Sequence, residues 1–135
     1  MFKHSLVYLG GFLLLISLLS FINIIYSYYF NLYLNLDSYF SALLISLLLG
    51  LILIFYKFKN FKLNSFNKIF LVILGYLTLP FIISLPYYFS IYNFSLIDSY
   101  FEAVSGFTST GFTIIDNIKH LDQSLILWLS LIHIW

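Results

Sequence analysis

The residues best suited to chemistry lie in one short segment, from Ser105 to Thr113, that is rich in glycine and hydroxyl side chains. Glycine adopts backbone angles that are closed to other residues, so such a loop can turn its carbonyl oxygens toward one point. The hydroxyl groups of Ser109 and Thr110 can add oxygen ligands or brace the loop. Oxygen atoms held in this way suit a dehydrated cation, because inward-facing carbonyls replace the hydration shell of the ion.

The titratable residues around this segment offer few other sites. Asp98 and Glu102 are four residues apart and share a helix face. We expect Asp98 to complement a helix N-terminus, and Glu102 to brace the loop or line a negatively charged vestibule, because it lies deeper and is costly to leave unpaired. His120 falls in a predicted outer loop. His133 lies in an apolar run, where it either contacts the ion path or packs between helices. No pair has metal-ligand or nucleophile–base spacing, which disfavours a membrane enzyme.

The composition places these residues in a membrane. The chain has 135 residues, of which 62% are hydrophobic and 8% charged, and its mean hydropathy is +1.02. A soluble domain of this length needs a polar surface that so few charges cannot cover. A net charge of +1 gives no indication of nucleic-acid binding, and the absence of cysteine excludes disulfides, thiolate metal sites and thiol nucleophiles.

Three apolar runs are long enough to cross a bilayer, at 5–26, 38–56 and 69–88. A signal peptide is the competing interpretation of the first run, which is longer than the apolar stretch of such peptides and has no small-residue cleavage site. In the third run, Pro80 predicts a kink and Pro86 a bend near the outer end. Close helix packing is expected at the glycines 10, 11, 50 and 75.

The distribution of charge predicts the orientation of the chain. Four of the six basic residues lie between Lys57 and Lys68, and the positive-inside rule places this loop in the cytoplasm. Lys3 places the N-terminus there as well. The acidic residues fall in the segments assigned outside, where Lys119 is the one basic residue.

A short helix precedes the glycine-rich segment. We expect it over Leu96–Phe107, capped by Ser95. At 1.5 Å per residue it is roughly 18 Å long, about half of a bilayer. Irregular backbone at that depth must contact protein or a water-filled cavity, and the negative C-terminal end of the helix favours cations. The last apolar run, from Gln123 to Trp135, is too short to cross, so the sequence is expected to be a fragment that ends inside its fourth span.

The segment from Asp98 to Thr113 resembles the first pore loop of the Trk/Ktr/HKT potassium transporters, especially the bacterial TrkH proteins. The likeness extends to Leu79-Pro-Phe-Ile82 and Ser124-Leu-Ile-Leu-Trp128. The resemblance implies potassium transport across the inner (plasma) membrane, with no further cofactor. It assigns the filter carbonyls to Ser109, Thr110, Gly111 and Phe112, and associates Gly111 with potassium selectivity. The filter is expected to be supported by Glu102, Ser105, Gly106, Thr108 and Thr113.

The same resemblance implies an all-α architecture in which four helix–pore loop–helix units surround one pore. Residues 1–57 would form two additional N-terminal helices, 58–68 the cytoplasmic loop, and 69–135 the first unit without its C-terminal end. A cytoplasmic nucleotide-binding regulatory subunit and a second copy of the full-length chain are the implied partners.

The sequence departs from the family pattern at a few positions. Ser109 and Phe112 stand where many TrkH proteins have threonine and alanine, which leaves the ion preference open. Leu129 stands where an arginine is common, so a salt bridge of that arginine is missing. The alternatives are a homotetrameric cation channel, with one loop from each chain, and a non-transporting membrane anchor.

Overall fold

The computed structural model describes residues 2–55 and 65–133, and this part of the chain is helical without strands. Its elements are the α-helices α1 (Phe2–Tyr29), α2 (Leu36–Phe55), α3 (Ser65–Ile83), α4 (Leu85–Tyr88), α5 (Leu96–Phe107) and α6 (Gln123–His133), and the 3-10 helix η1 (Ile118–His120). The described residues contain spans long and apolar enough to cross a membrane at Leu6–Tyr29, Leu36–Phe55 and Lys68–Tyr88. This confirms the expected all-α membrane fold.

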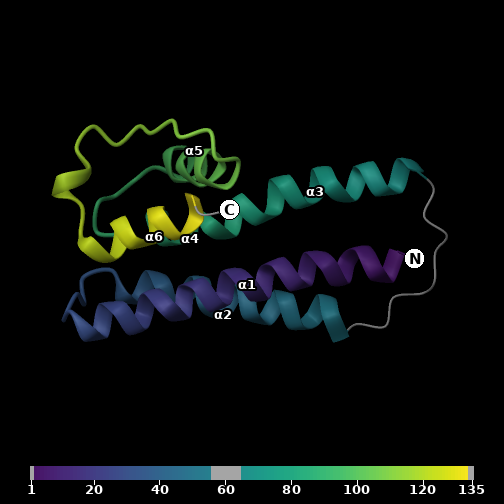
Figure 1. Cartoon of the computed structure of the whole chain (residues 1–135), viewed down its shortest axis with the longest axis horizontal. Coiled ribbons are helices and arrows are strands. Elements are labelled where there is room, and N and C mark those ends of the chain that lie inside the picture. Colours follow the sequence, from purple (N-terminus) through teal and green to yellow (C-terminus); the bar gives the residue numbers. More distant parts are fainter. Residues whose placement is uncertain (1, 56–64, 134–135) are drawn as a thin grey trace.

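The helices α1 and α2 form an antiparallel hairpin (Figure 1). The two backbones approach each other closely at Gly10 and Gly50. A Cβ atom on Gly10 would lie 3.0 Å from the Gly50 carbonyl oxygen and 2.9 Å from Cγ1 of Ile54. Two of the glycines predicted to mark close packing therefore do so. A Cβ atom on Gly11 would have no neighbour within 4 Å, and one on Gly75 would make an ordinary contact with Leu9 at 3.5 Å.

The third apolar run is divided into α3 and α4. Helix α3 continues past Pro80 to Ile83, and α4 begins with Pro86 in its first turn. The helix is thus interrupted just before Pro86, where the sequence predicts a bend. Because Pro86 has no N–H and the Tyr87 N–H donates to Ser84 at 3.1 Å, the chain cannot continue the α3 hydrogen-bond pattern. The Ile83 carbonyl accepts instead from the indole N–H of Trp128 at 3.3 Å.

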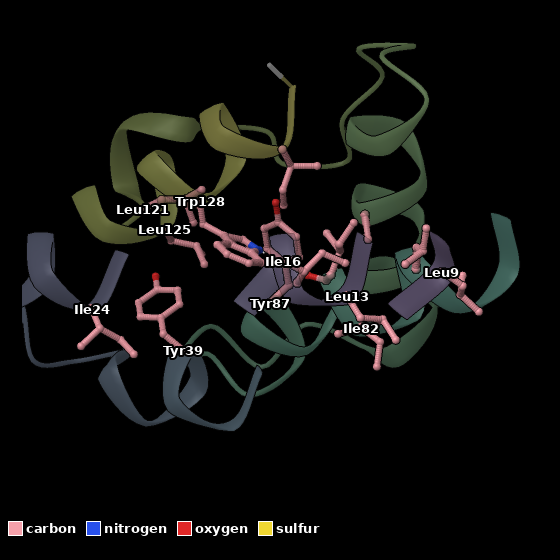
Figure 2. Close-up of a cluster of buried hydrophobic side chains, with 14 residues drawn as sticks. Leu9, Leu13, Ile16, Ile24, Tyr39, Ile82, Tyr87, Leu121, Leu125 and Trp128 are labelled. Carbon is pink, nitrogen blue, oxygen red and sulfur yellow. Dashed lines mark hydrogen bonds between the residues drawn. The ribbon is translucent and has the colours of Figure 1, made fainter. Parts of the chain in front are cut away.

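The core lies where α6 packs between the hairpin and the α3–α4 break. Figure 2 shows Trp128 of α6 near Tyr39 of α2, Tyr87 of α4 and Ile16 of α1. Trp128 and Leu125 are fully buried, and the rings of Trp128 and Tyr39 lie 6.2 Å apart. This core places α6, the last described helix, beside the middle and C-terminal part of α1.

A buried polar network crosses this core toward the turn between α1 and α2. Asn23 of α1 donates to the Ser124 carbonyl at 3.1 Å. The Ser124 hydroxyl lies 3.0 Å from the Tyr39 hydroxyl and donates to the Asp122 carboxylate. Asn35 donates to the same carboxylate at 3.3 Å. Three helices are therefore joined by hydrogen bonds as well as by apolar contact.

The ends of the helices fall into two groups (Figure 1). The start of α1, the end of α2 and the start of α3 lie at one end of the molecule, while the α1–α2 turn and η1 lie at the other. This grouping agrees with the expected topology, in which two spans separate the N-terminus from the basic loop. Three of the four lysines of that loop, Lys57, Lys59 and Lys62, lie outside the described residues.

Candidate ion-binding loop

The short helix α5 spans Leu96–Phe107, as the sequence predicts. The Ser95 hydroxyl accepts the Asp98 backbone N–H at 3.1 Å, which fixes the first turn. Asp98 stands in that turn and complements the helix N-terminus. The side of α5 that packs on the protein is small and polar, and its buried residues are Ser99, Glu102, Ala103, Ser105 and Gly106.

Helix α5 ends in a loop whose backbone changes handedness repeatedly. The φ angle is −90° at Thr108, +55° at Ser109 and +76° at Gly111. Among these residues only Ser109 and Gly111 have positive φ, so the sign alternates from residue 108 to 112. A positive φ at a serine costs about 1–3 kcal/mol and persists only where the surroundings impose it.

Hydrogen bonds from the last turn of α5 hold the loop. The Ser105 hydroxyl donates to the Phe112 carbonyl at 2.5 Å. The Ser105 carbonyl accepts the Thr110 backbone N–H at 3.0 Å and the Thr110 hydroxyl at 3.2 Å. The hydroxyls of Thr108 and Thr110 lie 3.0 Å apart. Ser105 therefore bonds the loop at two positions, Thr110 and Phe112.

Glu102 holds the far side of the loop. Its carboxylate oxygen Oε1 accepts the Thr113 hydroxyl and the Ile114 backbone N–H, both at 2.7 Å. Only 2% of Glu102 is exposed. Short hydrogen bonds to a carboxylate are among the strongest in proteins. Glu102 was expected either to brace the loop or to line a vestibule. The hydrogen bonds that it makes are those of a brace.

The backbone carbonyl oxygens of the loop differ in whether they accept a hydrogen bond. The Phe112 carbonyl is bonded to Ser105. Those of Ser109, Thr110 and Gly111 accept no hydrogen bond from the described part of the chain. These residues are exposed, as is Phe112 with 72% of its surface. Three exposed residues of the loop thus have backbone carbonyls that are unpaired within the described chain, while the fourth predicted filter carbonyl is bonded to Ser105 of the helix.

The remaining candidate residues lie apart from the loop. His120 is exposed in η1, as expected of a solvated side chain. His133 is the last residue of α6, and its side chain lies outside the described part of the structure. Within the described residues no group of three His, Cys, Asp or Glu side chains could hold a metal ion.

Sequence reasoning expected the Thr110 hydroxyl to bind an ion or brace the loop and Ser105 to support the filter, but it did not predict that these two residues contact each other. Ser105 and Thr110 are five residues apart and carry no signal of a mutual contact, because the contact depends on the chain reversing at Ser109. The network around Asp122 was missed as well. The sequence assigned Asp122 to an outer polar segment, although its carboxylate bonds side chains of two other segments.

Comparison with known proteins gives one informative likeness. The chain is 32% identical over 122 residues to an uncharacterized cation transporter of the archaeon Methanocaldococcus jannaschii. The match covers 90% of this chain and 25% of the relative, so the chain spans about a quarter of that protein's length. No family model matches the chain, and no solved structure shows a significant match.

Proposed function

We propose that this chain supplies one pore loop of a cation transporter, and that the transported ion is potassium. The carbonyl oxygens of Ser109, Thr110 and Gly111 replace part of the hydration shell of the ion. The observation that carries the proposal is this set of carbonyls, which accept no hydrogen bond from the described residues. Unpaired carbonyls next to a half-membrane helix need a partner, and a dehydrated cation is a suitable one.

The electrostatics around the loop support a cation rather than an anion. Helix α5 ends at Phe107 with no basic residue in its last turn, so its negative C-terminal end acts on the loop without a compensating charge. Glu102 adds a carboxylate that is bonded to Thr113 and Ile114, at the C-terminal end of the loop. A cation held at Gly111 would therefore experience attraction from the helix and from the brace.

The similarity to a cation transporter supports the same function. The relative is several times longer than the aligned 122 residues, which favours one long polypeptide with several pore loops over a homotetramer. The Trk-type assignment, the location in the inner membrane, the dimer and the nucleotide-binding regulatory subunit follow from the resemblance of residues 98–113 and belong to the proposal.

Gly111→Ser in the natural protein tests the proposal. A Cβ atom at Gly111 meets nothing within 4 Å, so the substitution acts through the backbone, where φ is +76°. The strain is about 1 kcal/mol or more, and a change of 1.4 kcal/mol in relative ion binding alters selectivity about tenfold. We expect potassium uptake to become several-fold more sensitive to sodium.

Gly11→Ser is the matched control. Gly11 also has open space around a new Cβ atom but lacks the positive φ. Uptake of potassium against a sodium challenge is measured for both variants and normalised to the protein level in the membrane. Unchanged selectivity in Gly111→Ser would show that this loop is not the filter.

A further inference from the structure

An apolar groove runs along the surface between α1 and α3 and reaches Phe107, the residue that precedes the loop. Its volume is about 410 Å³. The floor is formed by Leu9, Gly75 and Leu79, which are buried, and exposed walls are formed by Tyr8 and Val72 among others. The groove exists because Gly75 has no side chain at its centre, where a Cβ atom would meet only Leu9, at 3.5 Å.

The groove carries its charge at one end. Lys68 is the one charged residue among the described residues that line it. Lys68 begins the membrane span Lys68–Tyr88, and the first span begins at Leu6, so this end of the groove lies at the level of the lipid headgroups. The N-terminus of α3, at Ser65, adds the positive end of a helix dipole at the same level.

The other end of the groove is closed by the pore helix. Phe107, the last residue of α5, lines it together with Tyr76, and the two rings pack edge to face with centroids 5.6 Å apart. From Lys68 to Leu79 the groove extends about 16 Å along α3, at 1.5 Å per residue. A positive site at headgroup level followed by an apolar channel of this length is complementary to one phospholipid with a negative headgroup and one extended acyl chain.

We propose that the α1–α3 groove binds an anionic phospholipid, with its phosphate at Lys68 and an acyl chain running to the Tyr76–Phe107 ring pair. This site goes beyond the proposed transport function and does not depend on it. A bound chain packs against Phe107, so occupancy of the groove supports the end of α5 from which the loop departs.

The test uses the natural protein, purified and stripped of lipid. Binding of phosphatidylglycerol and of phosphatidylcholine with the same acyl chains is measured by native mass spectrometry. We expect a preference for phosphatidylglycerol that Lys68→Gln reduces about fivefold, since one basic residue near a membrane surface contributes about 1 kcal/mol. Lys119→Gln, at an exposed lysine in η1 at the other end of the molecule, should leave the preference unchanged.

A second pair of variants tests the apolar part of the site. Gly75→Phe fills the groove and should weaken binding of phosphatidylglycerol, whereas Gly11→Phe, on α1 outside the lining, should not. Photoactivatable phosphatidylglycerol should label the groove walls near Val72 in the unsubstituted protein. The proposal would be overturned if both lipids bound equally, or if Lys68→Gln left the preference for phosphatidylglycerol unchanged. It would also be overturned if a crosslinking probe at Val72 reacted with polypeptide in place of lipid. The last outcome would assign the groove to another segment of the protein or to a second copy.

Discussion

At the scale of single residues, Glu102 determines how the loop leaves helix α5. A carboxylate that is 2% exposed within a membrane protein is costly unless its oxygens are bonded. Here one oxygen accepts both the Thr113 hydroxyl and the Ile114 N–H. Glu102 therefore fixes the side of the loop opposite to the one that Ser105 holds.

Replacing Glu102 with alanine should release that side of the loop. The change removes both hydrogen bonds, each worth about 1.5–3 kcal/mol when a charged group takes part, and we expect a loss of thermal stability and of potassium uptake. Glu102→Gln keeps an acceptor oxygen and should have a smaller effect. The comparison is the melting temperature of the purified variants together with uptake per unit of membrane protein.

Asp98→Asn is the control for this series, since Asp98 lies on the same helix but only complements its N-terminus. It should cost no more than about 1 kcal/mol. If Asp98→Asn and Glu102→Ala lowered the melting temperature and the uptake equally, the hydrogen bonds of Glu102 to the loop would not explain the loss.

The sequence allowed a role to be predicted for each loop residue from its type, but not the groups that the residue contacts. Glu102 was predicted to brace or to line a vestibule because buried charge needs a partner. Which partner it has depends on the path of residues 108–114, where the positive φ angles at Ser109 and Gly111 decide which groups meet. The Ser105–Phe112 bond depends on the same angles.

At the scale of elements, the α1–α2 hairpin shows how two neighbouring glycines differ. Gly10 and Gly11 are adjacent in α1, yet only Gly10 faces the backbone of α2. Helical periodicity separates them by about 100°. Sequence alone could not tell which of the two lies in the contact, because both lie in an apolar run without polar residues to mark a face.

Gly10→Ala should therefore destabilise the hairpin, and Gly11→Ala should not. The new Cβ atom at Gly10 lies 3.0 Å from the Gly50 carbonyl oxygen, and overpacking of this kind costs about 1–3 kcal/mol. At Gly11 the change should stay within about 1 kcal/mol and can stabilise the helix. Thermal unfolding in detergent compares the two, and equal melting temperatures would contradict the close contact.

The break between α3 and α4 provides the second test at this scale. Trp128→Phe removes the donor to the Ile83 carbonyl and leaves that buried oxygen unpaired, which costs about 1–3 kcal/mol. Tyr100→Phe is a matched control, because the Tyr100 hydroxyl donates to the Leu77 carbonyl over the same 3.3 Å but in an exposed position. Stability should fall in the first variant and change little in the second. A similar loss in both would show that burial of the Trp128 bond is unimportant.

The elements themselves were predicted closely where local signals are strong. The bounds of α5 agree because Ser95 caps one end and the glycine-rich loop limits the other. The apolar runs give the spans to within a few residues, since hydrophobicity marks the membrane and not the turn where a helix ends. The packing of α6 beside α1 could not be predicted, because it depends on contacts between residues about 100 positions apart.

At the scale of the whole molecule, the two groups of helix ends predict which residues share a side of the membrane. In the proposed orientation Ser65 faces the cytoplasm and Lys119 faces outside. These 135 residues contain no cysteine, so within them a single cysteine at either position is the one target for a membrane-impermeant thiol reagent. Intact cells should be labelled at 119 and not at 65, and permeabilised cells at both.

The reverse pattern, with position 65 labelled and 119 protected in intact cells, would invert the orientation. Labelling of both positions in intact cells would contradict the separation of the two ends that Figure 1 shows.

The hydrogen bond between Asn23 and Ser124 has a consequence for biosynthesis. The two residues are 101 positions apart, and at about 5–20 residues per second the ribosome makes the second roughly 5–20 s after the first. During that interval Asn23 has no final partner, and an unpaired amide in hydrocarbon is unfavourable. The newly made α1 therefore has to keep Asn23 beside water or the insertion machinery. A ribosome-arrested chain that stops before Ser124 should crosslink from position 23 to that machinery, and a longer one to α6.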